Sequence, residues 1–226
     1  MSFQDAFLIT ILLSMVVSYL MGSINTAIII VRLRYNQDIR SLGSGNAGFT
    51  NVMRNFGKVP ATFTMAGDLL KGMVAIGLSY LLVFIMGKYV NTQLNGLLEN
   101  DIMGYIAAIF AILGHSFPIF YNFKGGKGVA VTCASMLVIE PILCVILVSL
   151  FLVVFLISRM VSLGSIIAAV GIPVSTYIKL RMENNENIMV ETCLAGIIAI
   201  MLILMHRKNI YRIIKGTENK FGNKKT

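Results

Sequence analysis

Two long stretches without a charged side chain constrain this chain more than any other feature of its sequence. Residues 6–31 carry no Asp, Glu, Lys or Arg over 26 positions, and residues 102–123 carry none over 22 positions. A helix that crosses a bilayer needs about 20 mostly apolar residues, at ~1.5 Å rise each. Charged residues make up only 13% of the chain. The sequence therefore predicts an all-α, polytopic membrane protein and excludes a soluble enzyme or a disordered chain.

Apolar runs predict seven membrane-spanning helices, at about 7–31, 59–87, 102–121, 128–139, 141–157, 162–180 and 188–205. The fourth run has only about three turns before Glu140-Pro141, so a half-length or tilted helix, and a total of six spans, remain alternatives. The spans leave no segment long enough for a soluble domain. We therefore expect one integral membrane domain over residues 1–226.

Lys and Arg are distributed unevenly between the segments that connect these spans. If the N-terminus lies outside, the inside segments are 32–58, 122–127, 158–161 and 206–226, and they hold 15 of the 19 Lys and Arg residues. The positive-inside rule favours this orientation, and it places the C-terminus in the cytoplasm. The net charge of +9 is thus interpreted as a topology signal and an anchor for anionic groups, not as a nucleic-acid surface.

A glycine-rich segment, SLGSGNAGFTNVMR at residues 41–54, lies in the first inside segment. It contains the pattern G-x-G-x-x-G, but the flanking membrane spans exclude the βαβ unit that a dinucleotide site needs. Clustered glycines and hydroxyls expose backbone N–H groups, which bind anions. Asn46, Asn51 and Arg54 would add side-chain donors. The segment predicts an anion-binding loop, with a plain glycine-rich turn as the alternative.

A second motif, GHSFPIFYNFKGGKGV at residues 114–129, leads directly into an apolar run. Its two lysines supply positive charge, and its last three glycines permit close approach of backbone to a ligand at a helix N-terminus. It is not a Walker A loop, because Tyr121 stands where glycine is needed and Gly128 replaces Ser or Thr. The motif predicts a phosphate-binding loop, with a basic turn as the alternative.

A third polar segment follows the last span. His206 and Asn209 are three residues apart, so they share one face of a helix. The neighbouring Arg207 and Lys208 also fit simple anchors that extend to the membrane surface. Composition alone does not separate these two interpretations.

Asp68 and Lys71 form a charged pair inside the second predicted span. Charges within a membrane are costly and are usually buried with a partner, so a structural ion pair is favoured over a catalytic role. The sequence contains no H-x-x-x-x-D and no G-x-S-x-G motif, and its two histidines form no evident metal cluster with Cys or acidic residues. We therefore expect anion-binding loops at one membrane face, without a strong base, a metal or another cofactor.

The three motifs, in this order, resemble those of the bacterial acyl-phosphate:glycerol-3-phosphate acyltransferases. The similarity runs over about residues 19–220 and includes the shorter matches Gly22-Ser23, Asp68 with Lys71-Gly72, and Ser158-Arg159. The chain departs from the family pattern at Phe49, where Ala is usual, and at Asn25, where Pro is common. Phe49 puts the packing of substrate against the first loop in question.

The resemblance implies a seven-span enzyme of the bacterial cytoplasmic membrane with its active site on the cytoplasmic face. It would transfer a fatty acyl group from acyl phosphate to the sn-1 hydroxyl of glycerol 3-phosphate, opening phospholipid synthesis, with a functional link to an acyl-phosphate synthase. Combined with the motif chemistry, it assigns catalysis to Ser44, Arg54, Lys127, His206 and Asn209. Substrate binding falls to Gly45, Asn46, Asn51, Lys124, Gly125, Gly126 and Gly128, and structural roles to Asp68, Lys71 and Glu218.

A membrane transporter of an organic phosphate is the alternative function. It too would place anion sites at broken helices, but it requires polar groups across the full membrane depth. The fifth and sixth predicted spans are almost wholly apolar, and the polar motifs all lie on the predicted cytoplasmic side. The sequence therefore favours an acyltransferase.

Overall fold

The computed structural model describes residues 3–90 and 101–222, and every regular element in these ranges is helical. The chain divides into two compact units, Met1–Ile139 and Glu140–Thr226. The end of the predicted cytoplasmic C-terminal segment, residues 223–226, lies outside the described residues. The prediction of a single domain over residues 1–226 stays a prediction.

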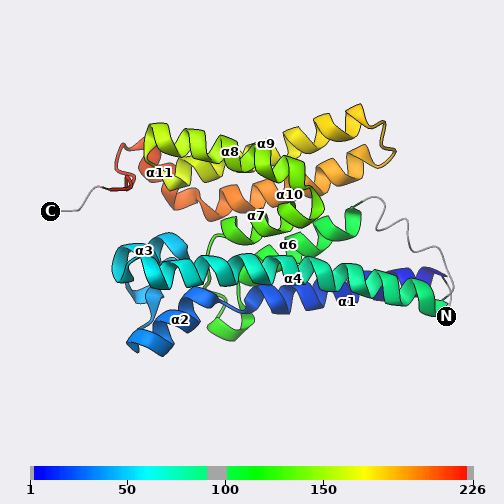
Figure 1. Ribbon diagram of the computed structural model, residues 1–226, viewed down its shortest axis with the longest axis horizontal. Coiled ribbons are helices and arrows are strands. Elements are labelled where there is room, and N and C mark those ends of the chain that lie inside the picture. Colours follow the sequence, from blue (N-terminus) through cyan, green and yellow to red (C-terminus); the bar gives the residue numbers. More distant parts are fainter. Residues whose placement is uncertain (1–2, 91–100, 223–226) are drawn as a thin grey trace. The chain divides into compact units, whose positions relative to one another are not determined.

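The first unit is built on two long helices that run side by side, α1 and α4 (Figure 1). Helix α1 also packs against α6, and α4 packs against α3, α6 and α7. The helices of this unit are α1 (Phe3–Ser23), α2 (Thr26–Tyr35), α3 (Phe49–Phe56), α4 (Lys58–Val90), α6 (Ile102–Ser116) and α7 (Val129–Ile139), with single 3₁₀ turns at η1 (Ile39–Ser41) and η2 (Ile119–Tyr121).

The first predicted span is not one continuous helix. It breaks between Ser23 and Thr26, where Asn25 has an extended backbone and its side-chain oxygen accepts a hydrogen bond of 3.1 Å from the N–H of Ile28. This is the bond that an N-cap residue makes, so Asn25 starts a second helix. The span predicted at 7–31 is present as a candidate span over 4–35, but it consists of two helices, because hydropathy does not register a polar cap inside an apolar run.

Helices α1 and α6 approach each other through glycine. A Cβ at Gly22 would overlap the carbonyl oxygen of Ala111 in α6, and a Cβ at Gly114 would overlap the carbonyl oxygen of Tyr19 in α1. Small residues permit such close packing between helices in membranes. The close fit places the end of α6, which carries the second motif, directly beside the break between α1 and α2.

The second unit consists of α8 (Pro141–Ser158), α9 (Val161–Met182), α10 (Ile188–Met205) and α11 (Arg207–Ile214). Helix α9 packs against α8, α10 and α11. Pro141 begins α8 at a first-turn position, where its missing N–H costs no hydrogen bond. Much of α8 is exposed and apolar, as at Ile142 and Leu156, which suits contact with lipid.

Six helical segments of the described residues are long and apolar enough to cross a bilayer: 4–35, 58–89, 102–121, 141–158, 161–182 and 188–205. The predicted span at 128–139 is a helix too, but α7 has only 11 residues. At ~1.5 Å per residue it covers about half of a ~30 Å hydrocarbon core. The structure therefore has six candidate spans and one half-length helix where the sequence predicts seven spans, because the chain turns at Glu140-Pro141.

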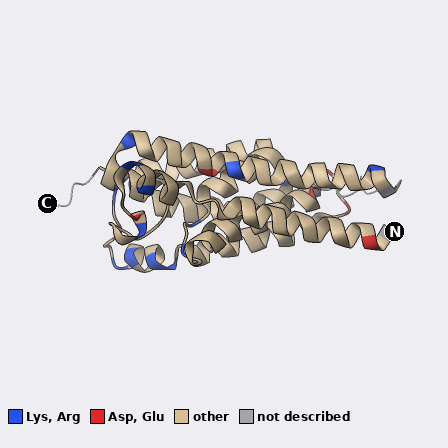
Figure 2. Ribbon diagram, turned by 90° about the horizontal axis from the view of Figure 1, so that it is seen from below, with Lys and Arg blue, Asp and Glu red and all other residues tan. Residues whose placement is uncertain are grey.

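Basic residues of the first unit gather at one end of its helices. Lys and Arg positions occur in α2, in α3 and at the start of α4, and Figure 2 shows blue ribbon segments gathered at the end opposite the N-terminus. This is the end that carries the first motif. The helices between the two ends present mostly apolar residues.

Candidate active site

The first motif forms a loop between η1 and α3, which we call loop 1 (residues 42–48). Asn51 holds this loop from within α3. Its side-chain oxygen accepts a hydrogen bond from the N–H of Ser44 at 3.1 Å, and its amide nitrogen donates to the carbonyl oxygens of Ile39 at 3.1 Å and Leu42 at 3.0 Å. Asn51 is only 1% exposed. These bonds occupy its amide, which favours a role in shaping loop 1 over the predicted direct contact with substrate.

The outer edge of loop 1 carries the residues assigned to catalysis and binding. Ser44 and Gly45 are exposed, Asn46 is half-buried, and Arg54 is exposed on α3. Gly43 and Gly45 have φ angles of +55° and +71°, in the left-handed region that glycine adopts most readily. The glycines thus allow the turn that presents Ser44 at the surface of the first unit.

The second motif folds back onto the end of α6 and forms loop 2 (residues 117–128). The N–H groups of Gly125 and Gly126 donate to the carbonyl oxygens of Ser116 and His115, each at 3.1 Å. Gly128 has a φ angle of +87° immediately before α7. Of the two lysines in this loop, Lys124 is exposed and Lys127 is half-buried. Loop 2 therefore combines positive charge with the N-terminus of a helix, as a phosphate site requires.

Loops 1 and 2 meet at the glycines of the second motif. The N–H of Ala47 donates to the carbonyl oxygen of Gly125 at 3.4 Å. A Cβ on Gly126 would overlap Nε2 of His115 and lie 2.7 Å from the carbonyl oxygen of Ala47. Only glycine fits at position 126 without a shift of the surrounding backbone. The two predicted anion loops, far apart in the sequence, thus form one cluster.

Arg40, which directly precedes the first motif, binds the backbone of loop 2, and the sequence did not predict this role. Its guanidinium donates to the carbonyl oxygens of Tyr121 at 2.6 Å and Lys124 at 3.3 Å, and it forms an ion pair of 2.7 Å with Asp38. The hydrogen bond from Arg40 lowers the pKa of Asp38 below its usual range and raises the pKa of Arg40. In the sequence, Arg40 counts only among the basic residues of the segment 32–58, which indicate topology.

A buried polar cluster lies beneath the two loops, where the break between α1 and α2 meets α4 and α6. The predicted pair joins Lys71 Nζ to Asp68 Oδ1 at 2.8 Å. Lys71 also contacts Nδ1 of His115 and the carbonyl oxygen of Ile24, each at 2.8 Å, and Thr26 donates to Asp68 at 2.6 Å. The sequence predicted the pair but not these partners, because they come from helices distant in the chain.

In the second unit, Glu218 is the centre of a hydrogen-bonded hub. Its carboxylate accepts bonds from Asn209 at 2.7 Å, Ser162 at 2.8 Å and Arg212 at 2.7 Å. Burial alone would raise the pKa of Glu218, but the bonds from Arg212, Ser162 and Asn209 outweigh it and lower the pKa below its usual range. The hub ties the C-terminal segment to the start of α9, and the structural role expected of Glu218 stays a prediction.

His206 lies at the junction of α10 and α11 and is 2% exposed. Its Nδ1 is 2.8 Å from the carbonyl oxygen of Leu202. A carbonyl oxygen only accepts a hydrogen bond, so Nδ1 of His206 carries a proton. Asn209, one turn further, has its amide turned to Glu218. The third motif thus contains a buried histidine whose Nδ1 is held by the carbonyl oxygen of Leu202.

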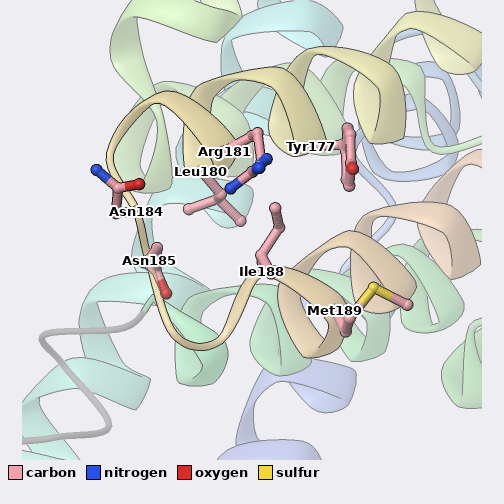
Figure 3. Close-up of a pocket in the computed structure, with 7 residues that line it drawn as sticks. All are labelled: Tyr177, Leu180, Arg181, Asn184, Asn185, Ile188 and Met189. Atoms are coloured by element: carbon pink, nitrogen blue, oxygen red, sulfur yellow. The ribbon is translucent and has the colours of Figure 1, made fainter.

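A shallow pocket of the second unit lies at the turn between α9 and α10 (Figure 3). The residues that line it are Tyr177, Leu180, Arg181, Asn184, Asn185, Ile188 and Met189. None of the predicted site residues is among them. Because Ser162 and the Glu218 hub lie at the opposite end of α9, this pocket plays no part in the candidate site.

Together these features define a class: an all-α, multi-pass integral membrane protein with glycine-rich, basic loops suited to phosphate. The family model for glycerol-3-phosphate acyltransferase matches residues 12–216. The chain is 37% identical over 210 residues to the glycerol-3-phosphate acyltransferase of Clostridioides difficile (strain 630), covering 93% of this chain and 95% of that protein. It is 38% identical to the glycerol-3-phosphate acyltransferase of Francisella tularensis subsp. holarctica (strain LVS), and the match covers 93% of this chain and 92% of that protein.

Two solved structures are also similar. Both are crystal structures of PlsY (YgiH), an integral membrane glycerol 3-phosphate acyltransferase, each 30% identical to this chain. The glycerol 3-phosphate form gives a TM-score of 0.76 and covers 94% of this chain and 96% of that chain. The lysophosphatidic acid form gives a TM-score of 0.73 and covers 94% of this chain and 95% of that chain. The chain therefore belongs to the PlsY-type glycerol-3-phosphate acyltransferase family, which confirms the resemblance and the enzyme class.

Proposed function

We propose that the enzyme transfers a fatty acyl group from acyl phosphate to the sn-1 hydroxyl of glycerol 3-phosphate. The products are 1-acyl-glycerol 3-phosphate and inorganic phosphate. The observation that carries the proposal is the meeting of loops 1 and 2 at Gly126, because this reaction needs two phosphate groups held close together. The relatives' names supply the acceptor. The acyl phosphate donor rests on the resemblance of the three motifs.

In this proposal, loop 2 stabilises phosphate with the N-terminus of α7, which it leads into, and with the charges of Lys124 and Lys127. Ser44 acts from loop 1 and Arg54 from the neighbouring helix α3, where an arginine offers a planar fork of donors to a phosphate. Catalysis is then mostly positioning and electrostatic stabilisation of the charge that develops on the leaving group.

The proton balance of the reaction does not demand a strong protein base. The glycerol hydroxyl forms a new C–O bond with the acyl carbon as the bond from that carbon to the phosphate oxygen breaks. The hydroxyl proton ends on the departing phosphate. Because acyl phosphate is an activated mixed anhydride, a cluster that holds and neutralises phosphate suffices.

The resemblance assigns contributions in the second unit to His206 and Asn209, and a structural role to Glu218. Support comes from the geometry within that unit. His206 is held by Leu202, and the carboxylate of Glu218 binds Asn209, Ser162 and Arg212. Loss of Glu218 would therefore disturb the third motif as a whole.

We also propose that the enzyme lies in the bacterial cytoplasmic membrane with its N-terminus outside, its C-terminus inside and its active site on the cytoplasmic face. The half-length α7 would complete the seventh crossing together with the loop before it. The distribution of Lys and Arg supports this orientation. Fusion of a reporter to each terminus tests it, and a cytoplasmic N-terminal reporter contradicts it.

The decisive assay is release of inorganic phosphate by the purified protein in detergent. We expect release from acyl phosphate only when glycerol 3-phosphate is present, and no transfer from acyl-CoA or acyl-carrier protein at matched concentration. A chelator such as EDTA should leave the rate unchanged, because the proposal includes no metal. Glycerol 3-phosphate uptake into proteoliposomes without acyl transfer would instead support the transporter.

A further inference from the structure

The buried cluster of Asp68, Lys71 and His115 has no role in the reaction proposed above, yet it lies directly beneath the loops. Asp68 is 2% exposed, Lys71 5% and His115 4%. Groups of this kind inside a membrane protein are costly unless they satisfy one another. A cluster that is costly to bury and lies beside the loops is expected to hold part of the site in place.

The hydrogen bonds of Lys71 decide the state of the histidine. An ammonium group has three N–H donors and no acceptor. Lys71 places its Nζ 2.8 Å from three atoms: Oδ1 of Asp68, the carbonyl oxygen of Ile24 and Nδ1 of His115. Nδ1 therefore accepts a hydrogen bond from Lys71, and the neutral ring carries its proton on Nε2.

The competing arrangement, in which Nδ1 donates to Asp68, is not supported by the geometry. Nδ1 lies 3.7 Å from Oδ1 of Asp68, beyond hydrogen-bond reach. That oxygen already receives Thr26 Oγ1 at 2.6 Å and Lys71 at 2.8 Å. The carboxylate of Asp68 thus forms an ion pair with Lys71, and Lys71 forms the hydrogen bond to His115.

The other edge of the imidazole meets the phosphate loop. Nε2 occupies the space that a Cβ on residue 126 would fill, and the carbonyl oxygen of Ala47 borders the same space. The backbone of His115 also accepts the N–H of Gly126 at 3.1 Å. The Nε2 proton is thus a polar donor at the point where loops 1 and 2 meet.

We propose that His115 is a positioning residue for both loops, and that the Asp68–Lys71 pair fixes its tautomer with the proton on Nε2. The inference deepens the proposed function and rests on it: the histidine would hold Gly126 and Ala47 in the arrangement that receives phosphate. His115 acts through the loops rather than on the reacting atoms. The buried ion pair therefore determines which ring nitrogen of the neutral His115 carries the donor proton.

The tautomer is measured directly by ¹⁵N NMR of the full-length protein, labelled at histidine, in detergent. The chain has two histidines, and His206 supplies an internal reference with a protonated Nδ1, because its Nδ1 donates to Leu202. The spectrum of His115→Gln assigns the signals. We expect His115 to carry its proton on Nε2 at neutral pH. A proton on Nδ1, or on both nitrogens, overturns the proposal.

The link to the ion pair is tested with the double variant Asp68→Asn and Lys71→Met, which removes both charges together. We expect His115 to lose its single tautomer and show a mixture. Lys88→Met on the same helix is the control, because Lys88 is exposed and lies over the ring of Phe84. An unchanged Nε2 tautomer in the double variant overturns the assignment of control to the pair.

Kinetics test the positioning role. The amide nitrogen of His115→Gln reaches the place of Nε2 and keeps a donor there, whereas His115→Asn keeps only an acceptor near the place of Nδ1. We expect the Asn variant to raise KM for at least one phosphorylated substrate about tenfold, the size of one lost hydrogen bond. The Gln variant should stay within about threefold of the parent protein.

Equal and normal KM values in both variants would overturn the positioning role, provided that their melting temperatures match the parent protein. Equal losses in both variants overturn it as well, because a donor at Nε2 would then not matter. If the variants do not fold, the tautomer of the parent protein still decides. Absence of acyl transfer by the parent protein is a separate failure, that of the proposed function, and leaves the NMR result intact.

Discussion

The two polar regions of this enzyme are held together by different means. In the first unit, loops 1 and 2 are joined by backbone groups, with glycines where side chains would not fit. In the second unit, the third motif is joined by the carboxylate of Glu218, which binds three side chains. A side chain added at a glycine should disrupt the first cluster by steric overlap. Removal of the charge of Glu218 should disrupt the second. The two regions should therefore respond to different substitutions.

The sharpest separation should come from Gly126→Ala. The added methyl group would overlap Nε2 of His115 and crowd the carbonyl oxygen of Ala47, so the loops must move apart. We expect kcat/KM to fall by on the order of 10²-fold, the effect of a displacement of about 1 Å at a site of positioning.

Two controls accompany this variant. Lys124→Ala should cost less, because Lys124 is exposed and Lys127 retains charge in loop 2. Gly77→Ala, within α4, should be nearly neutral, since a Cβ there meets nothing within 4 Å. A larger loss from Lys124→Ala, with both proteins folded, would mean that loop 2 acts through charge alone.

Arg54→Lys tests whether the first cluster also depends on a particular side chain. A lysine keeps the charge but not the planar pair of donors that grips a phosphate. We expect a loss of turnover of about tenfold or more, close to that of Arg54→Ala. Steady-state kinetics on both purified variants measure this, and near-normal turnover of the lysine variant would refute bidentate recognition.

Glu218→Gln should affect stability before chemistry. The amide keeps the shape of the side chain but leaves Arg212 without its carboxylate partner. We expect the free energy of unfolding to fall by about 2 kcal/mol, the size of a charged hydrogen bond. Thermal melting in detergent measures the change, with the exposed Glu186→Gln as the control. An unchanged melting temperature would show that the hub does not hold the third motif.

The smallest effect is the pH dependence of the same hub. The pKa of Glu218 is lowered from its ordinary value of 4.5 in the folded protein. Its stabilising contribution is therefore complete above pH 4.5 and is lost as the pH falls through the lower, folded-state pKa. We expect the melting temperature of Glu218→Gln to fall less than that of the parent protein between pH 5 and pH 3. Parallel curves would assign the acid sensitivity to other groups.

Much of this fold was predictable because membrane spans depend on one-dimensional composition. The charge-free stretches predicted the all-α class, and Glu140-Pro141 indicated why the helix at 128–139 is short. The break at Asn25 was not predicted, since one capping side chain barely changes the hydropathy of an apolar run. The residue was noted only as a departure from the family pattern.

In the candidate site, too, local features were predictable from the sequence and contacts between distant residues were not. The sequence singled out both glycine-rich loops and the Asp68–Lys71 pair, because those signals are local. It did not find the bond from Arg40 to Tyr121 or the contact of Lys71 with His115, which join residues 81 and 44 positions apart. Such contacts depend on how helices pack, and no local pattern records that.

The order in which the chain is synthesised gives the buried cluster a further consequence. Ile24 and Thr26 emerge first, Lys71 follows Ile24 by 47 residues, and His115 follows Lys71 by 44 more. An unpaired charge costs about 2.5–3.5 kcal/mol at the centre of an inserting helix. Asp68 and Lys71 lie one turn apart on α4, so each enters the bilayer beside its counter-charge, with the acceptor at Ile24 and the donor at Thr26 already made. The histidine arrives last, at charges that are already neutralised, so the membrane insertion machinery never has to accommodate the cluster as separate ions.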